Sequence, residues 1–233
     1  GVLVALAVPP AWRGDLPAIG DGIGEAVRAA GTLIVGGDLS GGGELALTFT
    51  VLGTTERPVG RHGARPGDAV WVTGRLGAPR RALAAWLAGG TPEPADRLRF
   101  ARPEARLEAG AWLAEHGAAA MVDLSDGLLA DLSHIAAASG VQLVVDPAQL
   151  PLAPGATVED ALTGGEEYEL ALAAPPALDA VAFAARFGVP LTRVGHVDGA
   201  AEGSAEGTGR VRVAGNGATH RVELPAGHDH FSL

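Results

Sequence analysis

Short apolar runs alternate with segments of helical periodicity along the first part of the chain. Residues 2–8 are apolar throughout and end at two prolines, which is typical of a buried strand. In residues 15–30 apolar side chains recur every three or four positions, and this spacing predicts a helix. Further strands are expected at residues 32–35 and 44–53. A strand, a helix and two strands within about fifty residues indicate half of a ferredoxin-like layer.

A loop-like stretch rich in proline and glycine, residues 57–68, separates this part from the rest. We therefore predict two domains, at residues 1–60 and 65–233. The second domain continues to alternate strands and helices, which predicts α/β layers. Its strands are expected at residues 69–73, 118–122, 141–145, 168–173, 191–196 and 210–213, and helices at residues 76–87, 104–116, 158–162 and 178–187. Residues 91–106 are charged and broken by prolines, so we expect solvated surface there, and residues 210–222 are expected to form a terminal hairpin.

One polar turn stands out in the second domain, the sequence Asp-Leu-Ser-Asp-Gly at residues 123–127. An apolar run leads into it, and leucines at helical spacing follow it, so the turn joins a strand to a helix. Ser125 or Asp126 can cap that helix, which is the plain structural interpretation. Carboxylates also hold Mg²⁺, and a helix N-terminus offers N–H groups to phosphate. His134, further along this helix, is expected to be a packing or surface residue.

Two other turns share this combination of acidic residues with glycine, GGD at residues 36–38 and GGEE at residues 164–167. Glycine lets the backbone approach a ligand closely. Acidic clusters without cysteine or paired histidine ligands favour Mg²⁺ or Mn²⁺ over zinc. Arg61, in the glycine-rich loop, is a candidate phosphate contact because a guanidinium binds phosphate oxygens in pairs. Together these features indicate a metal–nucleotide site.

The amino-acid composition excludes several classes of function. The formal net charge of −10 argues against a nucleic-acid partner. The chain has no lysine, which excludes a P-loop, a protein-kinase strand lysine and a pyridoxal Schiff base. It has no cysteine, so disulfides and thiolate chemistry are excluded as well. No apolar run approaches the roughly 20 residues that span a bilayer, and we expect no membrane partner and a cytoplasmic location.

Five motifs then follow one another in a specific order: GGD at residues 36–38, R-x-G-A-x-P-G-D-x-x-x-V-T-G at 61–74, D-x-S-D-G-L at 123–128, G-G-E-x-Y-E-L at 164–170, and D-H-F at 229–231. This order resembles the thiamine-monophosphate kinase family, whose superfamily includes aminoimidazole ribonucleotide synthetase. The resemblance extends over essentially the whole chain. It implies an α+β fold with two domains, a truncated ferredoxin-like N-terminal half that binds ATP and Mg²⁺, and a C-terminal α/β layered domain.

The resemblance implies that the γ-phosphoryl group of ATP is transferred directly, in line, to thiamine monophosphate, giving thiamine diphosphate. Several Mg²⁺ ions would take part, bound by Asp38, Asp123 and Asp126, with Asp126 as the catalytic residue beside the transferred group. Asp38, Arg61 and Ser125 would contact ATP. Glu166 would contact the thiamine moiety, together with His228, which stands where the family has an aromatic residue. The N-terminal domains would pair through their sheets into a homodimer.

Two alternatives to this kinase remain open. One is a sister ATP-dependent synthetase or hydrogenase-maturation enzyme, against which the GGEEYEL and DHF motifs argue. The other is a non-catalytic remnant that binds nucleotide. The family's N-terminal acidic motifs are absent from this sequence, which begins at Gly1 without methionine. We therefore expect further metal ligands upstream, without which this stretch alone would be inactive.

Overall fold

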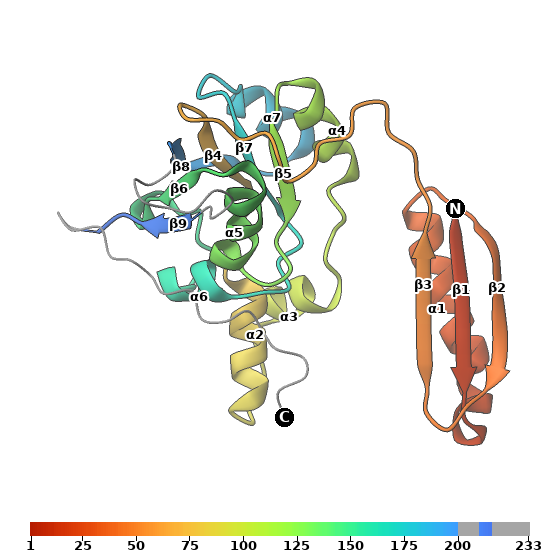
Figure 1. Ribbon diagram of the computed structural model, residues 1–233. Coiled ribbons are helices and arrows are strands. Elements are labelled where there is room, and N and C mark those ends of the chain that lie inside the picture. The colour runs from red at the N-terminus through yellow and green to blue at the C-terminus, as the bar shows by residue number, and fades with distance from the viewer. Residues whose placement is uncertain (200–209, 216–233) are drawn as a thin grey trace. The chain divides into compact units, whose positions relative to one another are not determined.

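The computed structural model describes residues 1–199 and 210–215, and the chain divides into two compact units, Gly1–Glu56 and Arg57–Leu233 (Figure 1). Each unit is described by itself. No helix in the described part of the chain is long and apolar enough to cross a membrane.

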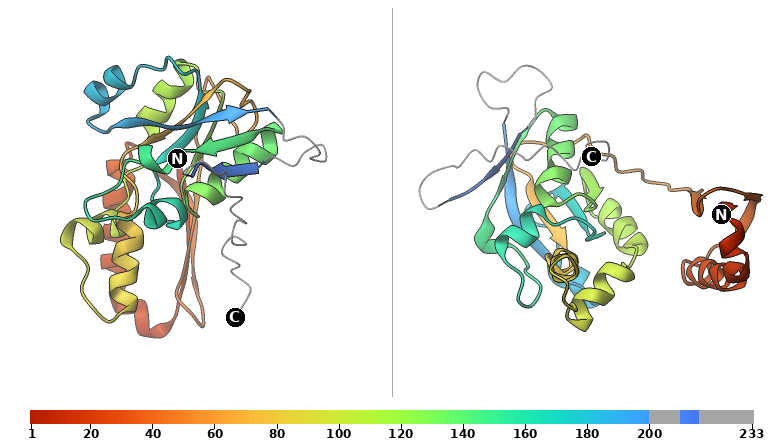
Figure 2. Two further views of the ribbon diagram at one scale, coloured as in Figure 1. Left: turned by 90° about the vertical axis from the view of Figure 1, so that its left-hand side faces the viewer. Right: turned by 90° about the horizontal axis from the view of Figure 1, so that it is seen from below.

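The first unit is a three-stranded sheet with one helix along it. Its strands are β1 (Val2–Val8), β2 (Ile34–Gly41) and β3 (Ala46–Val51), in the order β2-β1-β3. Strand β1 runs parallel to β2 and antiparallel to β3. A 3-10 turn (Pro10–Asp15) leads into helix α1 (Leu16–Ala29), which lies on one side of the strands (Figure 2). The strand–helix–strand–strand order predicted from the sequence is confirmed.

The GGD motif of the first unit is not a turn, as the sequence had suggested, but part of strand β2. Gly37 pairs with Val4 of β1, and a Cβ atom at Gly37 would lie 1.8 Å from the Val4 carbonyl oxygen. Close strand pairing therefore explains the glycine here. Asp38 pairs with Ala5 and is exposed.

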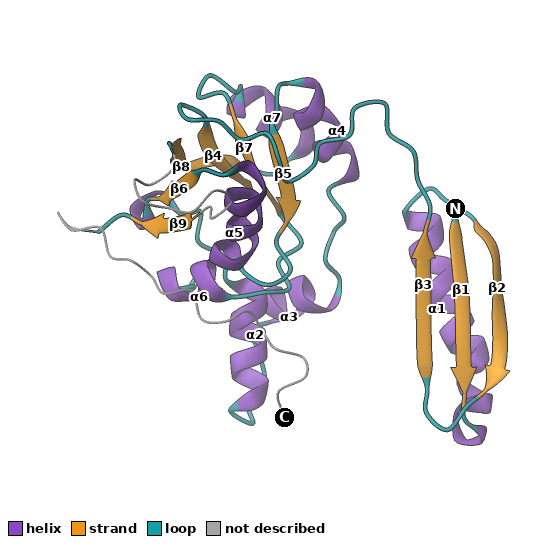
Figure 3. Ribbon diagram, in the orientation of Figure 1, coloured by secondary structure: helices purple, strands orange, loops and turns teal. Residues whose placement is uncertain are grey.

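The second unit is built on a six-stranded sheet of order β5-β7-β4-β8-β6-β9. All its neighbouring strands are antiparallel except β6 and β9, which are parallel (Figure 3). The strands are β4 (Ala69–Thr73), β5 (Ala120–Asp123), β6 (Gln142–Val145), β7 (Leu170–Ala174), β8 (Leu191–Asp198) and β9 (Arg210–Val213). The predicted terminal hairpin cannot be traced beyond β9, because residues 216–233 lie outside the described residues.

Helices pack on both faces of this sheet, because successive side chains of a strand point to opposite sides. Val70 and Val72 of β4 belong to a core with helix α5 (Leu128–Ser139). Trp71, between them, belongs to a second core with helices α4 (Leu107–Glu115) and α7 (Ala180–Phe187). The remaining helices are α2 (Ala78–Leu87), α3 (Pro94–Ala101), α6 (Val158–Thr163) and the 3-10 turn η2 (Pro147–Gln149). The result is the α+β architecture expected from the sequence.

Candidate active site at the acidic turns

Two of the three acidic motifs meet at one end of the six-stranded sheet. The turn at residues 123–127 follows β5, and the GGEE turn at residues 164–167 precedes β7. Strands β5 and β7 are antiparallel neighbours, with Asp123 opposite Leu170. The end of one strand therefore lies beside the start of the other, which brings both turns together.

Backbone hydrogen bonds join the two turns. The Leu124 amide donates to the Glu169 carbonyl oxygen (2.9 Å), and the Tyr168 amide donates to the Leu124 carbonyl oxygen (2.8 Å). The Glu166 amide donates to the Ser125 carbonyl oxygen over 2.9 Å. These bonds extend the pairing of β5 and β7 into the turns and fix Ser125 next to Glu166.

The glycines of the GGEE turn are required by this close packing. A Cβ atom at Gly165 would lie 2.4 Å from the Ser125 carbonyl oxygen, and one at Gly164 would lie 2.4 Å from the Asp160 carbonyl oxygen. Real Cβ atoms do not approach oxygen so closely, so a side chain at Gly165 would push the turns apart, and one at Gly164 would collide with the end of helix α6. The sequence suggested that glycine admits a ligand, whereas here it admits a neighbouring backbone.

Asp131, which sequence analysis missed, holds the turn that precedes α5. Its Oδ2 atom accepts hydrogen bonds from the amides of Asp126 (3.0 Å) and Gly127 (3.1 Å). The predicted caps are wrong, because Gly127 occupies the N-cap position and no side-chain cap bond forms there. Ser125 and Asp126 are thereby left available to a ligand, and Asp126 is exposed.

A cation can fit between Asp126 and helix α5. One ligand atom from each of Asp126, Asp131 and His134 lies within 4.8 Å of the other two. Burial raises the pKa of Asp131, the two backbone amides oppose that shift, and the carboxylates of Asp126 and Asp123 add to it. His134 is exposed, as expected for a surface residue, yet it lies beside these carboxylates. Carboxylate oxygens suit Mg²⁺, and an imidazole adds affinity for Mn²⁺.

Glu166 and Tyr168 both adopt the left-handed backbone conformation, with φ angles of 64° and 49°. Residues other than glycine rarely adopt it, and such strain concentrates at functional sites. The Tyr168 hydroxyl donates to Glu166 Oε2 over 3.2 Å. Burial, followed by the nearby Glu166 carboxylate, raises the pKa of Tyr168. The hydroxyl thus keeps its proton and orients the Glu166 carboxylate.

Glu167, between these two residues, points into the protein. It is 1% exposed, and its Oε1 atom accepts a hydrogen bond from the Gly77 amide at the start of α2. Its Oε2 atom is buried without a partner among the described residues. Burial raises the pKa of Glu167 to about 7, although the Gly77 amide and the Arg99 guanidinium oppose the shift.

Glu169, also 1% exposed, is held by two arginines. Arg106 donates to both of its carboxylate oxygens, over 2.9 Å and 2.6 Å, and Arg99 donates over 3.1 Å. The Thr73 hydroxyl completes the set at 2.7 Å. Both arginines come from residues 91–106, most of which are exposed, as predicted. The prediction fails at Arg99 and Arg106 themselves, which are partly buried because they anchor the Glu169 carboxylate.

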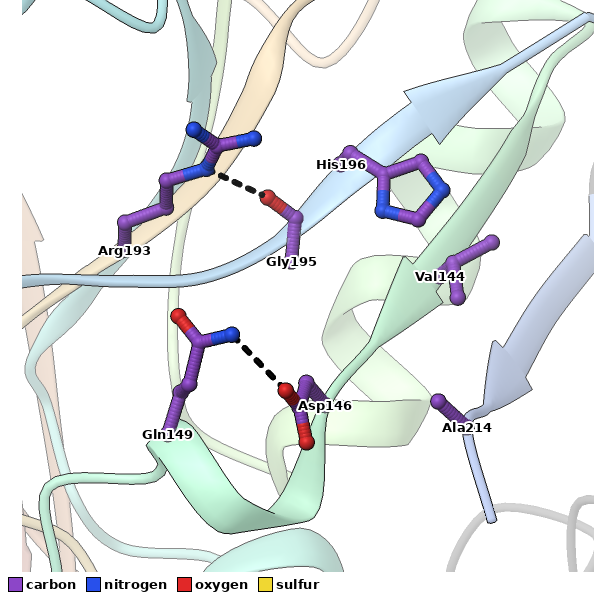
Figure 4. Close-up of a pocket in the computed structure, with 7 residues that line it drawn as sticks. All are labelled: Val144, Asp146, Gln149, Arg193, Gly195, His196 and Ala214. Carbon is purple, nitrogen blue, oxygen red and sulfur yellow. Dashed lines mark hydrogen bonds between the residues drawn. The ribbon is translucent and has the colours of Figure 1, made fainter. Parts of the chain in front are cut away.

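The other predicted site residues lie elsewhere. Arg61 is exposed, and its carbonyl oxygen accepts a hydrogen bond from the Ser139 hydroxyl over 3.2 Å. Asp38 belongs to the first unit, and His228 lies outside the described residues. A cavity of about 290 Å³ in the second unit is lined by other residues, among them Asp146, Arg193 and His196, and does not include the acidic turns (Figure 4).

Comparison with known proteins identifies the family to which this chain is similar. The family model of the AIR synthase related protein, C-terminal domain, matches residues 65–207. Thiamine-monophosphate kinase of Halobacterium salinarum is 40% identical over 197 residues, which are 81% of this chain and 66% of that protein. The chain spans only 54% and 61% of the kinases of Methanopyrus kandleri and Rhodopirellula baltica.

Two solved structures agree with this relationship. The crystal structure of thiamine-monophosphate kinase from Stenotrophomonas maltophilia has a TM-score of 0.80 at 34% identity, over 93% of this chain and 72% of that chain. The structure of AaThiL complexed with AMPPCP and TMP has a TM-score of 0.80 at 32% identity, over 99% of this chain and 73% of that chain. The chain therefore belongs to the AIR synthase-related proteins and, among them, to the thiamine-monophosphate kinase family.

Proposed function

We propose that this protein transfers the γ-phosphoryl group of ATP to thiamine monophosphate and so forms thiamine diphosphate. The observation that carries the proposal is the pairing of the DLSDG and GGEE turns, which fixes Ser125 beside Glu166 in a chain of this family. A related structure, 32% identical, contains the ATP analogue AMPPCP together with TMP.

The reaction needs no covalent enzyme intermediate. An oxygen of the thiamine monophosphate phosphate group forms a bond to the γ-phosphorus of ATP. The bond from that phosphorus to the bridging oxygen breaks, and ADP leaves. Such transfers depend on positioning and on neutralising charge rather than on a protein nucleophile. The absence of lysine and cysteine is compatible with this chemistry.

Carboxylate oxygens are the ligands that Mg²⁺ prefers, and Asp126 belongs to the cluster with Asp131 and His134, which supports a magnesium site at the acidic turns. Asp123 and Asp126 would bind it there, and Asp38 would bind another ion in the first unit. When bound, the ion neutralises the charge on the transferring phosphate. Asp131 keeps the Asp126 backbone in place through its bond to the Asp126 amide.

The remaining predicted residues divide between the two substrates. Ser125, Asp38 and Arg61 are proposed to contact ATP, because hydroxyl and guanidinium groups donate to phosphate oxygens. Glu166 is proposed to contact the thiamine moiety, whose positive charge its carboxylate complements. His228 remains a proposed contact to the same moiety. Because ATP is a substrate, we place the protein in the cytoplasm.

Turnover measurements test the proposal. Two forms are purified, this chain and any longer natural chain that contains it. Each is incubated with Mg-ATP and thiamine monophosphate, and the thiamine diphosphate formed is measured. We expect product from the longer chain, and a loss of about 100-fold or more in Asp126→Asn, since one lost charge-stabilising group costs that much. Glu115→Gln removes an exposed carboxylate at the end of α4 and serves as the matched control. No product from any form, with the fold intact, would favour the sister enzyme or the nucleotide-binding remnant.

We also propose a homodimer that forms through the sheet of the first unit. Leu39, Leu47, Phe49 and Val51 of that sheet are 61%, 40%, 48% and 74% exposed. Large exposed apolar surfaces mark interaction sites. Analytical ultracentrifugation should find a dimer for the wild type and a monomer for Phe49→Asp. A monomeric wild type would contradict the proposal.

A further inference from the structure

Arg80, on the first turn of α2, lies directly against the GGEE turn. A Cβ atom at Gly164 would be 2.7 Å from Arg80 Cβ and 3.3 Å from Arg80 Cγ. The stem of Arg80 therefore crosses the bare backbone of Gly164. No other residue type at position 164 would leave room for this contact.

The same glycine connects Arg80 to the other acidic turn. A Cβ atom at Gly127 would lie 3.3 Å from the Gly164 carbonyl oxygen. Gly127 directly follows Asp126 and begins helix α5. Arg80, Gly164 and Gly127 thus form a chain of close contacts, and the long stem of Arg80 carries its guanidinium beyond that contact.

Three other arginines of this unit already have acidic partners. Arg81 pairs with Asp96 at 2.8 Å, and Arg99 and Arg106 pair with Glu169. Arg80 is exposed and forms no hydrogen bond or ion pair with any described residue. Its charge therefore has no acidic partner among the described residues, and its side chain starts from a point in contact with the GGEE turn.

We propose that Arg80 binds a phosphate group of the substrate held at the acidic turns. This inference rests on the proposed function, because it assumes that a phosphate ligand reaches this site. A guanidinium binds phosphate oxygens in pairs and keeps its charge at every physiological pH. Carboxylates alone repel a phosphate, and a cation of the protein on the opposite side balances that repulsion.

Isothermal titration calorimetry of three phosphate probes tests the inference. The dissociation constants of inorganic pyrophosphate, AMPPCP and thiamine monophosphate are measured, each with Mg²⁺. Arg80→Ala should weaken at least one of them by about ten-fold or more, as the loss of a charged hydrogen bond does. The affected probe identifies the substrate whose phosphate Arg80 contacts. Arg80→Lys should have a smaller effect, because lysine keeps the charge but not the paired donors.

Arg186→Ala is the matched control, since Arg186 is an exposed arginine on α7, in the layer opposite α5. It should bind all three probes like the wild type, and all variants should unfold at the same temperature. Wild-type affinities in Arg80→Ala, or no binding of any probe to the wild type, would overturn the inference. Pyrophosphate binding that depends on Arg80, in a protein without kinase activity, would support the inference while refuting the proposed function.

Discussion

The Glu166 amide donates a hydrogen bond to the Ser125 carbonyl oxygen over 2.9 Å, and this bond joins two motifs about forty residues apart in the chain. It continues the β5–β7 ladder past the last paired residues. The candidate site is therefore an extension of the sheet rather than a pair of independent loops. Its geometry depends on backbone contacts that side-chain substitutions can disturb.

Substitution of Gly165 by alanine should disrupt this contact. The new Cβ atom would lie 2.4 Å from the Ser125 carbonyl oxygen, so the turns must separate. We expect the free energy of unfolding to fall by about 1–3 kcal/mol, measured by urea denaturation. Gly199→Ala is the control, because no described residue lies within 4 Å of its Cβ position. Equal stability of the two variants would show that the turns are not tightly packed.

Substitution of Arg106 by alanine should be more damaging. It removes two donors from the buried Glu169 carboxylate and leaves Arg99 and Thr73 to compensate. Breaking a buried ion pair costs about 3–5 kcal/mol, which should appear in the same denaturation measurement. Adding Glu169→Gln should restore part of the loss, since the stranded charge is then gone. A loss no larger than that of the exposed Arg186→Ala would contradict this account.

Glu167 should make stability depend on pH. Its pKa is raised from 4.5 to about 7 in the folded protein, so the folded state holds its proton more tightly than the unfolded chain. The stabilisation is complete below about pH 4.5 and is lost as the pH rises through about 7. The loss amounts to at most about 3 kcal/mol.

Unfolding free energies measured from pH 5 to pH 8 check this prediction. Glu167→Gln keeps an acceptor for the Gly77 amide but cannot ionise, so its profile should be flatter than that of the wild type. Parallel profiles for the two proteins would rule out Glu167 as the titrating group.

The spacing of apolar residues predicted most of the fold, because most strands and helices follow local patterns of apolar and polar positions. The apolar runs became strands, and β4 has the predicted bounds at Ala69–Thr73. The GGD motif was wrongly predicted to be a turn, because glycine is as compatible with a tightly paired strand as with a turn. Gly37 faces the Val4 carbonyl oxygen, a partner more than thirty residues away that no local pattern reveals.

The sequence predicted which residues form the candidate site, but not which residues hold them in place. Motif order led to Asp123, Asp126 and Glu166, and their proposed roles remain predictions. Asp131 was missed, although an acidic residue in the first turn of a helix is a recognisable signal for capping. Arg99 and Arg106 were read as surface because charge predicts exposure, and only the fold shows that they meet Glu169. Long-range partners of this kind depend on topology, which a single sequence does not display.

Tracing the γ-phosphate of ATP tests the central claim most directly. With γ-labelled ATP, Mg²⁺ and thiamine monophosphate, the account predicts that the label appears in thiamine diphosphate. The label should reach the product at a rate reduced by about 100-fold or more in Asp126→Asn. Label released only as inorganic phosphate, or incorporated equally well by Asp126→Asn, would contradict it.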